Sequence, residues 1–373
     1  DIRVTSNELE GIEIISQLNQ LSFSANEYRD MMMARNYDRT DEAAQRIQRA
    51  KAVVREKLDA LDKVFANSNL LLPAHRSRLE SAWRKSIDEN LGAALTLPEY
   101  LASYGAVSSE TDKMIVEIAK ASGLTAETEP QLSAELMLYL EKLRAVAVNA
   151  SLLRAYADNT LNTAFVDSAT VSVIEAIYAD AGTALTQAEE ASAAISREYP
   201  DSPIGKMMKN TSEQVGKVLE MVNEQLIEAF EEKMAWHEFH TAAARNLEGV
   251  AMMDEHILQN AHSIVEERLY LKESNRVMLV VSLLFLLGVI TYLYLGLYIT
   301  LRQNIAGMVD SAAKVAYGDM TVQVDHVSQD EFAILTTNFN SMGEQMRALI
   351  TSARGSSTMT QEHADKVQQL AQH

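Results

Sequence analysis

The sequence predicts an all-α protein with one membrane-spanning helix, and three observations support this fold class. The 373 residues include only 14 Gly and 5 Pro, with 8 Phe, 13 Tyr and 2 Trp, and this poverty of turn formers and aromatics argues against a β-sandwich or barrel. Apolar residues recur at alternating spacings of three and four over long stretches, which is typical of helices packed nearly parallel. Finally, residues 277–301 carry no charge.

The composition also excludes several classes of function. The chain has no Cys, which rules out disulfides, thiolate metal sites and Cys nucleophiles. Its formal net charge of −19 argues against nucleic acid as a partner, because few cations are present to neutralise phosphates. The sequence contains no Gly-rich phosphate loop, nucleophile elbow or paired acid–base constellation. We therefore expect neither catalysis nor a cofactor.

Residues 1–276 are expected to form an elongated helical domain. Apolar stripes run through 11–32, 132–157 and 208–264. Pro73, Pro98 and Pro130 are expected to open helices, because proline lacks the N–H that a helix interior needs. No proline follows Ile204, so one long helix is expected over 205–300. The pattern favours two stacked four-helix units that share long helices.

Residues 277–301 are predicted to cross a membrane. About 20 apolar residues span a 30 Å hydrocarbon core, and Arg276 and Arg302 flank this run. Tyr292, Tyr294 and Tyr298 lie near its C-terminal end, where aromatic rings favour the interface. A buried helix in a large globule is the alternative. The basic residues on the two sides nearly balance and do not fix orientation, but the acidic N-terminal part suits an extracytoplasmic space.

Residues 302–352 show two short amphipathic helices with a connector between them. Apolar stripes run through 305–315 and 332–349, separated by a break at 317–319 and an alternating apolar run at 320–324. Ser328 and Glu331 have the spacing of a capping box. Since neither short helix can bury its stripe alone, we expect a parallel four-helix coiled coil formed by two chains, hence a homodimer.

This segment resembles a HAMP domain, the signal converter of bacterial transmembrane receptors. The resemblance rests on Gly318 with Met320 and Val324, on the pair at 330–331 (Asp-Glu) and on 338–342 (Asn-Phe-Asn-Ser-Met). The proline usual near the start of the first helix is missing, which would allow the spanning helix to run on. The residues expected to pack or convert the signal are Ile305, Met308, Ala312, Val315, Gly318, Met320, Val324, Glu331, Leu335, Phe339 and Met342.

The whole layout resembles a methyl-accepting chemotaxis protein with a helical bimodular sensor domain. The pattern Glu8-Leu9-x-Gly11 with Tyr28-Arg29 is similar to the first helix of such receptors. The resemblance implies a bacterial inner-membrane chemoreceptor with residues 1–276 in the periplasm, HAMP in the cytoplasm and a signalling helix beginning at 353–373. It further implies a cytoplasmic kinase and coupling protein as partners. Two alternatives stay open. The chain could be the sensor and HAMP portion of a histidine kinase or diguanylate cyclase, and its outer domain could bind a periplasmic binding protein rather than a free ligand.

A small organic acid or amino acid is the expected ligand, and Arg forks with Tyr hydroxyls would suit its carboxylate. The candidate ligand-binding residues are Tyr28, Arg29, Arg78, Arg84, Tyr139 and Arg144.

Polar residues on the third stripe allow two interpretations. Lys233, His240 and Asp254 interrupt this otherwise apolar stripe, and such residues either fix the register of a bundle or line a polar pocket. His237 and His240 have a spacing that could share one helical face, but no third ligand is close in sequence. No metal site is therefore predicted.

Overall fold

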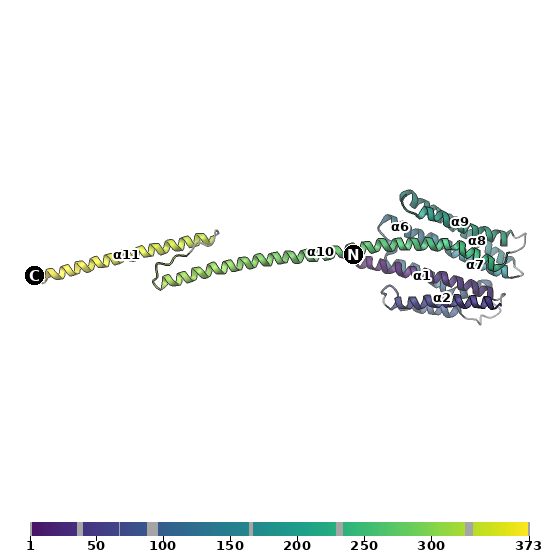
Figure 1. Cartoon of the computed structure of the whole chain (residues 1–373), viewed down its shortest axis with the longest axis horizontal. Coiled ribbons are helices and arrows are strands. Elements are labelled where there is room, and N and C mark those ends of the chain that lie inside the picture. The colour runs from purple at the N-terminus through teal and green to yellow at the C-terminus, as the bar shows by residue number, and fades with distance from the viewer. Residues whose placement is uncertain are drawn as a thin grey trace. The chain divides into compact units, whose positions relative to one another are not determined.

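The computed structural model describes residues 2–35, 40–66, 68–87, 96–163, 167–228, 234–324 and 331–371. These ranges fold into helices and short connections and contain no strand (Figure 1), so the all-α prediction is confirmed. Lys233, Ser328 and Asp330 of the sequence predictions lie outside the described residues. The chain divides into two units, Asp1–Ser274 and Asn275–His373.

In chain order the helical elements are α1 (Ile2–Arg35), α2 (Asp41–Phe65), α3 (Pro73–Ser86), α4 (Leu97–Tyr104), α5 (Ala106–Ser122), the 3₁₀ turn η1 (Leu124–Ala126), α6 (Pro130–Met137), the π-helix η2 (Leu138–Leu143), α7 (Arg144–Asn162), α8 (Ser168–Glu198), α9 (Ile204–Val222), the π-helix η3 (Asn223–Ile227), α10 (Trp236–Ala316) and α11 (Glu331–Ala371).

Helix α1 lies at the centre of the first unit and packs against α2, α5 and α7. Its apolar stripe is almost fully buried, as Leu18 and Leu21 show. The backbones of α1 and α5 approach closely at Gly11, where an added Cβ would lie 2.4 Å from the Cβ of Ser122. Only glycine fits this crossing without displacing α5.

Local sequence signals set the start of several helices in this unit. Pro73 and Pro130 are the first residues of α3 and α6, and Pro98 lies in the first turn of α4. Asp167 caps α8, because its side chain accepts a 2.6 Å hydrogen bond from the backbone N–H of Thr170. The Asp167 side chain thus satisfies an N–H group that has no partner within the helix. A proline at a helix start instead removes one such N–H group.

The helices of the first unit lie beside one another. In Figure 1, α2, α1, α7, α8 and α9 run side by side, and α1 packs against α7 while α8 packs against both α7 and α9. The expected pair of stacked four-helix units is not confirmed by this arrangement.

The expectation of one helix over 205–300 is wrong. Helix α9 ends at Val222 and passes into the π-helix η3, and α10 begins only at Trp236. The chain returns along itself, because the hydroxyl of Thr211 on α9 donates to the backbone carbonyl of Gly249 on α10. The π-helix ends at Ile227, and the φ of −98° and ψ of 21° of the next residue, Glu228, depart from helical geometry.

The second unit contains the rest of α10 and α11. Helix α10 carries a segment long and apolar enough to cross a membrane, with a mean hydropathy of 2.5 over its most apolar stretch and none of that stretch buried. The helix continues without interruption through Asn304 to Ala316. It ends before Gly318, whose φ of +97° is a conformation that favours glycine.

The connector after Gly318 is attached to α11. The side-chain amide of Asn340 donates to the carbonyl of Val324 at 2.9 Å and accepts from its N–H at 2.9 Å. The guanidinium of Arg347 donates to the carbonyl of Met320 at 2.9 Å. These bonds satisfy connector backbone groups that have no helical partner.

Candidate ligand-binding site

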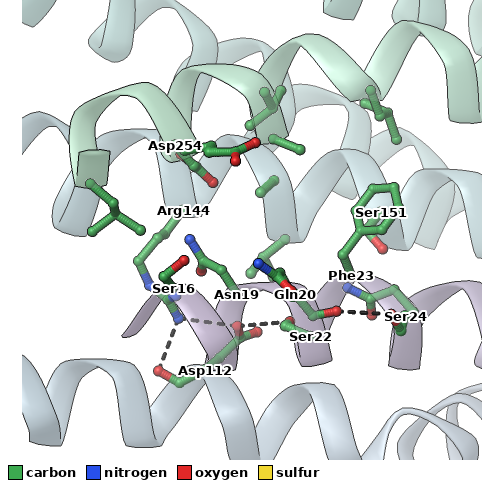
Figure 2. A pocket seen from close by; sticks show the side chains of 18 of the residues that line it. Ser16, Asn19, Gln20, Ser22, Phe23, Ser24, Asp112, Arg144, Ser151 and Asp254 are labelled. Carbon is green, nitrogen blue, oxygen red and sulfur yellow. Dashed lines mark hydrogen bonds and ion pairs between the residues drawn. The ribbon is translucent and has the colours of Figure 1, made fainter. Parts of the chain in front are cut away.

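A cavity of about 370 Å³ lies inside the first unit, between α1, α5, α7 and the first part of α10. Figure 2 shows α1 along one side, with Ser16, Asn19 and Ser22, and α10 on the opposite side, with Asp254. The volume falls in the range typical of small-molecule sites. This space between helices is therefore a candidate place for a ligand.

Arg144 is held at one wall of the cavity by α5. Its guanidinium donates to the backbone carbonyl of Asp112 at 2.9 Å and pairs with the carboxylate of the same residue at 3.1 Å. The hydroxyl of Ser22 on α1 donates to that carboxylate at 3.2 Å. Burial raises the pKa of Asp112, and the nearby guanidinium of Arg144 opposes this shift.

The π-helix η2 comes directly before Arg144 and includes Tyr139. The Tyr139 side chain is fully buried, and its hydroxyl donates at 2.9 Å to the amide oxygen of Asn19, which lines the cavity. A π-helical turn rotates the side chains that follow it relative to an ordinary α-helix, and such turns are frequent at functional sites. Arg144 is the first residue after this π-helix.

Asp254 enters the cavity from α10 without a counter-charge bonded to it. Its side chain is 9% exposed, and its Oδ1 has no hydrogen-bond partner among the described residues. Burial raises its pKa to about 8, an effect that Arg144 reduces and Asp112 increases. A buried carboxyl group without a partner is unfavourable for folding. A group of this kind is retained in binding sites, where a ligand supplies the missing partner.

A buried network of charges lies beside the cavity and joins α1, α7 and α10. Asp30 accepts from Arg29 at 2.8 Å and from Arg154 at 2.6 Å. Arg154 also pairs with Glu27 at 3.3 Å. His240 of α10 contacts Glu27 at 2.9 Å and Asp158 at 2.6 Å, so the network ties all three helices together.

The ionisation of His240 follows from these contacts. Burial alone would lower its pKa, but the hydrogen bonds to Asp158 and Glu27 are stronger and raise the pKa to about 10. His240 is therefore a cation at neutral pH. Burial raises the pKa of Asp158 to about 6 in spite of that bond. The network thus pairs three acidic with three basic side chains.

Asp30, Asp158 and His240 each offer a ligand atom within 4.8 Å of the others, close enough to hold a metal ion. However, both oxygens of Asp30 already accept from Arg29 and Arg154, and both ring nitrogens of His240 contact carboxylates. A divalent cation would meet two guanidinium groups at this position. The geometry therefore favours an ion-pair network over a metal site.

The structure separates the six candidate ligand-binding residues. Arg144 lines the cavity, Tyr139 lies directly behind its wall, and Arg29 belongs to the charge network. Arg29 also faces a second hollow of about 1020 Å³ between α4, α5 and α7.

The other three candidates line neither hollow. Tyr28 packs against Trp83 with ring centroids 5.9 Å apart. Arg78 pairs with Glu110 and Glu117 across α3 and α5. Arg84 is exposed, and its guanidinium donates to the carbonyl of Glu80 in its own helix.

Sequence reasoning missed most of the remaining polar lining. Ser16, Asn19, Phe23 and Asn26 recur at spacings of three and four and line the cavity from α1. This stripe, which is polar except for Phe23, runs beside the apolar one and was a usable signal. The interpretation of Asp254 as the wall of a polar pocket agrees with its position, whereas the exposed His237 does not share a site with buried His240.

The residues of the HAMP-like segment lie on α10, the connector and α11 of the second unit. Exposed side chains in the single chain include Ile305, Ala312, Glu331, Leu335 and Met342, and half-buried ones include Met308, Val315, Met320, Val324 and Phe339. Gly318 takes the positive φ described above. Much of the apolar surface of both helices therefore has no cover within one chain.

No known protein family, curated protein or solved structure matches the chain.

Proposed function

We propose that this chain is a transmembrane receptor that binds a small molecule in the cavity of its first unit and passes the signal to the other side of the membrane. The observation that carries the proposal is the composition of the cavity wall. One side of it is α10, through Leu247, Val250 and Asp254, and the same helix carries the apolar stretch that could cross a membrane. A ligand would therefore contact the signalling helix directly.

The second unit would act as the signal converter. Its two helices expose Ile305, Leu335 and Met342, and exposed apolar stripes at heptad spacing are covered when helices associate. We infer a homodimer in which these stripes form a parallel four-helix coiled coil, as the resemblance to a HAMP domain implies. A shift of α10 by about one or two Å is enough to change such a packing.

In this proposal the first unit is periplasmic, residues 277–301 cross the inner membrane of a bacterium, and residues 302–373 are cytoplasmic. The output would be control of a kinase, as in a methyl-accepting chemotaxis protein. A histidine kinase or diguanylate cyclase would use the same sensor and converter, and a periplasmic binding protein could deliver the signal instead of a free ligand. The unpartnered Asp254 inside the cavity favours the free small molecule.

Thermal unfolding of the purified full chain in detergent tests the binding step. The two tryptophans, Trp83 and Trp236, both lie in the first unit, so tryptophan fluorescence reports on that unit alone. We expect at least one compound of a metabolite library to raise the melting temperature. Arg144→Gln, in the cavity, should reduce that increase, whereas Arg84→Gln, outside it, should leave the increase unchanged. A library without a single stabilising compound contradicts the proposal.

Transmission can be measured with introduced cysteines, because the chain has none of its own. A single Cys at Leu335 in vesicle-reconstituted protein should form disulfides between chains. A stabilising compound should change the rate of that reaction. An unchanged rate with a bound ligand would show that binding does not reach the second unit.

A further inference from the structure

We propose that the ligand of this cavity carries a protonated amine, which is received by the carboxylate of Asp254; this inference rests on the proposed function and names its ligand class. The cavity walls and their charges support it in three steps.

The first step is a balance of charges. The charged residues that line the cavity are Lys57, Asp112, Arg144, Arg154, Asp254 and Glu255. Arg154 is occupied by the carboxylates of the buried network. Arg144 is occupied by Asp112, at 3.1 Å. At the rim, Lys57 donates to Gln20 and Glu255 is exposed. One buried acidic side chain, that of Asp254, is thus left without a cation bonded to it.

The second step concerns the partner that Asp254 lacks. Its Oδ1 accepts no hydrogen bond among the described residues, and a buried carboxylate needs a donor, preferably a charged one. An ammonium group supplies N–H donors and a positive charge together. A ligand with only a carboxylate would instead meet Asp254 across the cavity from Arg144, whose guanidinium Asp112 already engages.

The third step concerns the rest of the ligand. Figure 2 shows Asp254 on the α10 side, facing side chains of α1 such as Asn19 and Ser22. The wall between them includes apolar side chains, among them Val148, Leu247 and Leu258. An amine with a short apolar body matches this division, because its ammonium reaches the carboxylate while its carbon chain stays against the apolar wall.

The test compares three probes of equal length with the full chain in detergent: n-butylammonium, n-butanol and butyrate. Binding is measured by titrating each probe while tryptophan fluorescence follows thermal unfolding. We expect n-butylammonium to bind the wild-type chain about tenfold or more tightly than either of the other probes, as a charge-assisted hydrogen bond requires. Asp254→Asn, which keeps the shape of the side chain, should weaken the binding of n-butylammonium by about tenfold or more.

Glu248→Gln is the matched control, since Glu248 is an exposed carboxylate of the same helix, α10, and does not line the cavity. It should leave the affinity for n-butylammonium within about twofold. The inference is overturned if n-butylammonium does not stabilise the chain, if butyrate or n-butanol binds equally well, or if Asp254→Asn retains affinity. The metabolite library tests the proposed function separately, because a hit that lacks an amine would support a receptor while it refutes this ligand class.

Discussion

Replacing Asp254 by Asn should stabilise the first unit, and the gain should grow with pH. The pKa of Asp254 lies at about 8 in the folded protein, against 3.8 as its ordinary value. Between these two values the unfolded chain has lost the proton and the folded chain keeps it, so the free energy of unfolding falls as the pH rises. Each pH unit lowers the free energy of unfolding by about 1.4 kcal/mol, which amounts to about 4 kcal/mol between pH 4 and pH 7.

Asn does not titrate, so the free energy of unfolding of the variant does not fall with pH in this way. The difference in free energy of unfolding between Asp254→Asn and the wild type should therefore increase by about 4 kcal/mol from pH 4 to pH 7 and level off above pH 8. Urea unfolding of the full chain in detergent, followed by the fluorescence of Trp83 and Trp236, measures it.

A difference that stays constant within about 1 kcal/mol from pH 4 to pH 7 would refute the reasoning. It would mean that Asp254 is ionised in the folded protein and has a partner there. In that case the unpartnered acidic side chain in the cavity, on which the amine inference depends, would not exist. The same experiment thus tests the premise of the ligand class without any ligand.

Three further predictions concern other parts of the chain. His240→Gln should lower the free energy of unfolding by about 3 kcal/mol at pH 6 and by less near pH 10, because the raised pKa of His240 makes its contribution largest below its ordinary pKa; an equal loss at both pH values in urea unfolding would contradict this. Leu335→Cys should give disulfide-linked dimers on oxidation in membranes, while Glu344→Cys, on the opposite face of α11, should stay monomeric on a non-reducing gel. Gly11→Ala should destabilise the first unit by about 1–3 kcal/mol because α5 leaves no room for a Cβ, whereas Gly182→Ala, with open space around it, should stabilise by about 0.5–1 kcal/mol in the same unfolding assay.

The sequence predicts the features of this fold that depend on neighbouring residues. Helix starts at Pro73, Pro130 and Asp167 follow from the backbone chemistry of those residues. The end of α10 before Gly318 follows from the ease with which glycine adopts a positive φ. The continuation of α10 beyond the apolar stretch also agrees with the missing proline near Asn304.

The reversal between α9 and α10 could not be predicted in this way. No proline lies between Ile204 and Trp236, and a π-helix that ends at Ile227 precedes the reversal. What favours the reversal is burial, because it brings Phe239 and Ala243 of α10 against the core. Such a gain depends on tertiary contacts that are far apart in sequence.

The sequence predicts a polar site between helices, but it does not predict which residues line that site. Arg84 and Arg144 are chemically identical side chains on amphipathic helices, yet only Arg144 lines the cavity. The difference comes from the rotation of each helix, which for α7 follows the π-helix η2. Asp254 could be identified because a charged residue within an apolar stripe stands out, whereas Asp112 has no such contrast with its neighbours.

The contacts of α10 explain how a ligand at Asp254 could move the helix. His240 ties α10 to Asp158 and Glu27, and Asp254 follows 14 positions later, about 21 Å along the axis. Arg268 then holds α10 to Glu127 at 3.1 Å. The cavity lies between these two fixed contacts. There the Oδ1 atom of Asp254 on α10 has no hydrogen-bond partner among the described residues.

Binding an ammonium at Asp254 adds an attraction between the two fixed contacts, so any shift of α10 must stretch one of them. The Arg268 side chain is 23% exposed and the His240 side chain is 7% exposed, so the contact at Arg268 is the more accessible to water. Since water replaces a lost contact at an exposed ion pair more easily than at a buried one, the shift should occur at the Arg268 end. In the proposed receptor this is the end from which α10 continues toward the membrane.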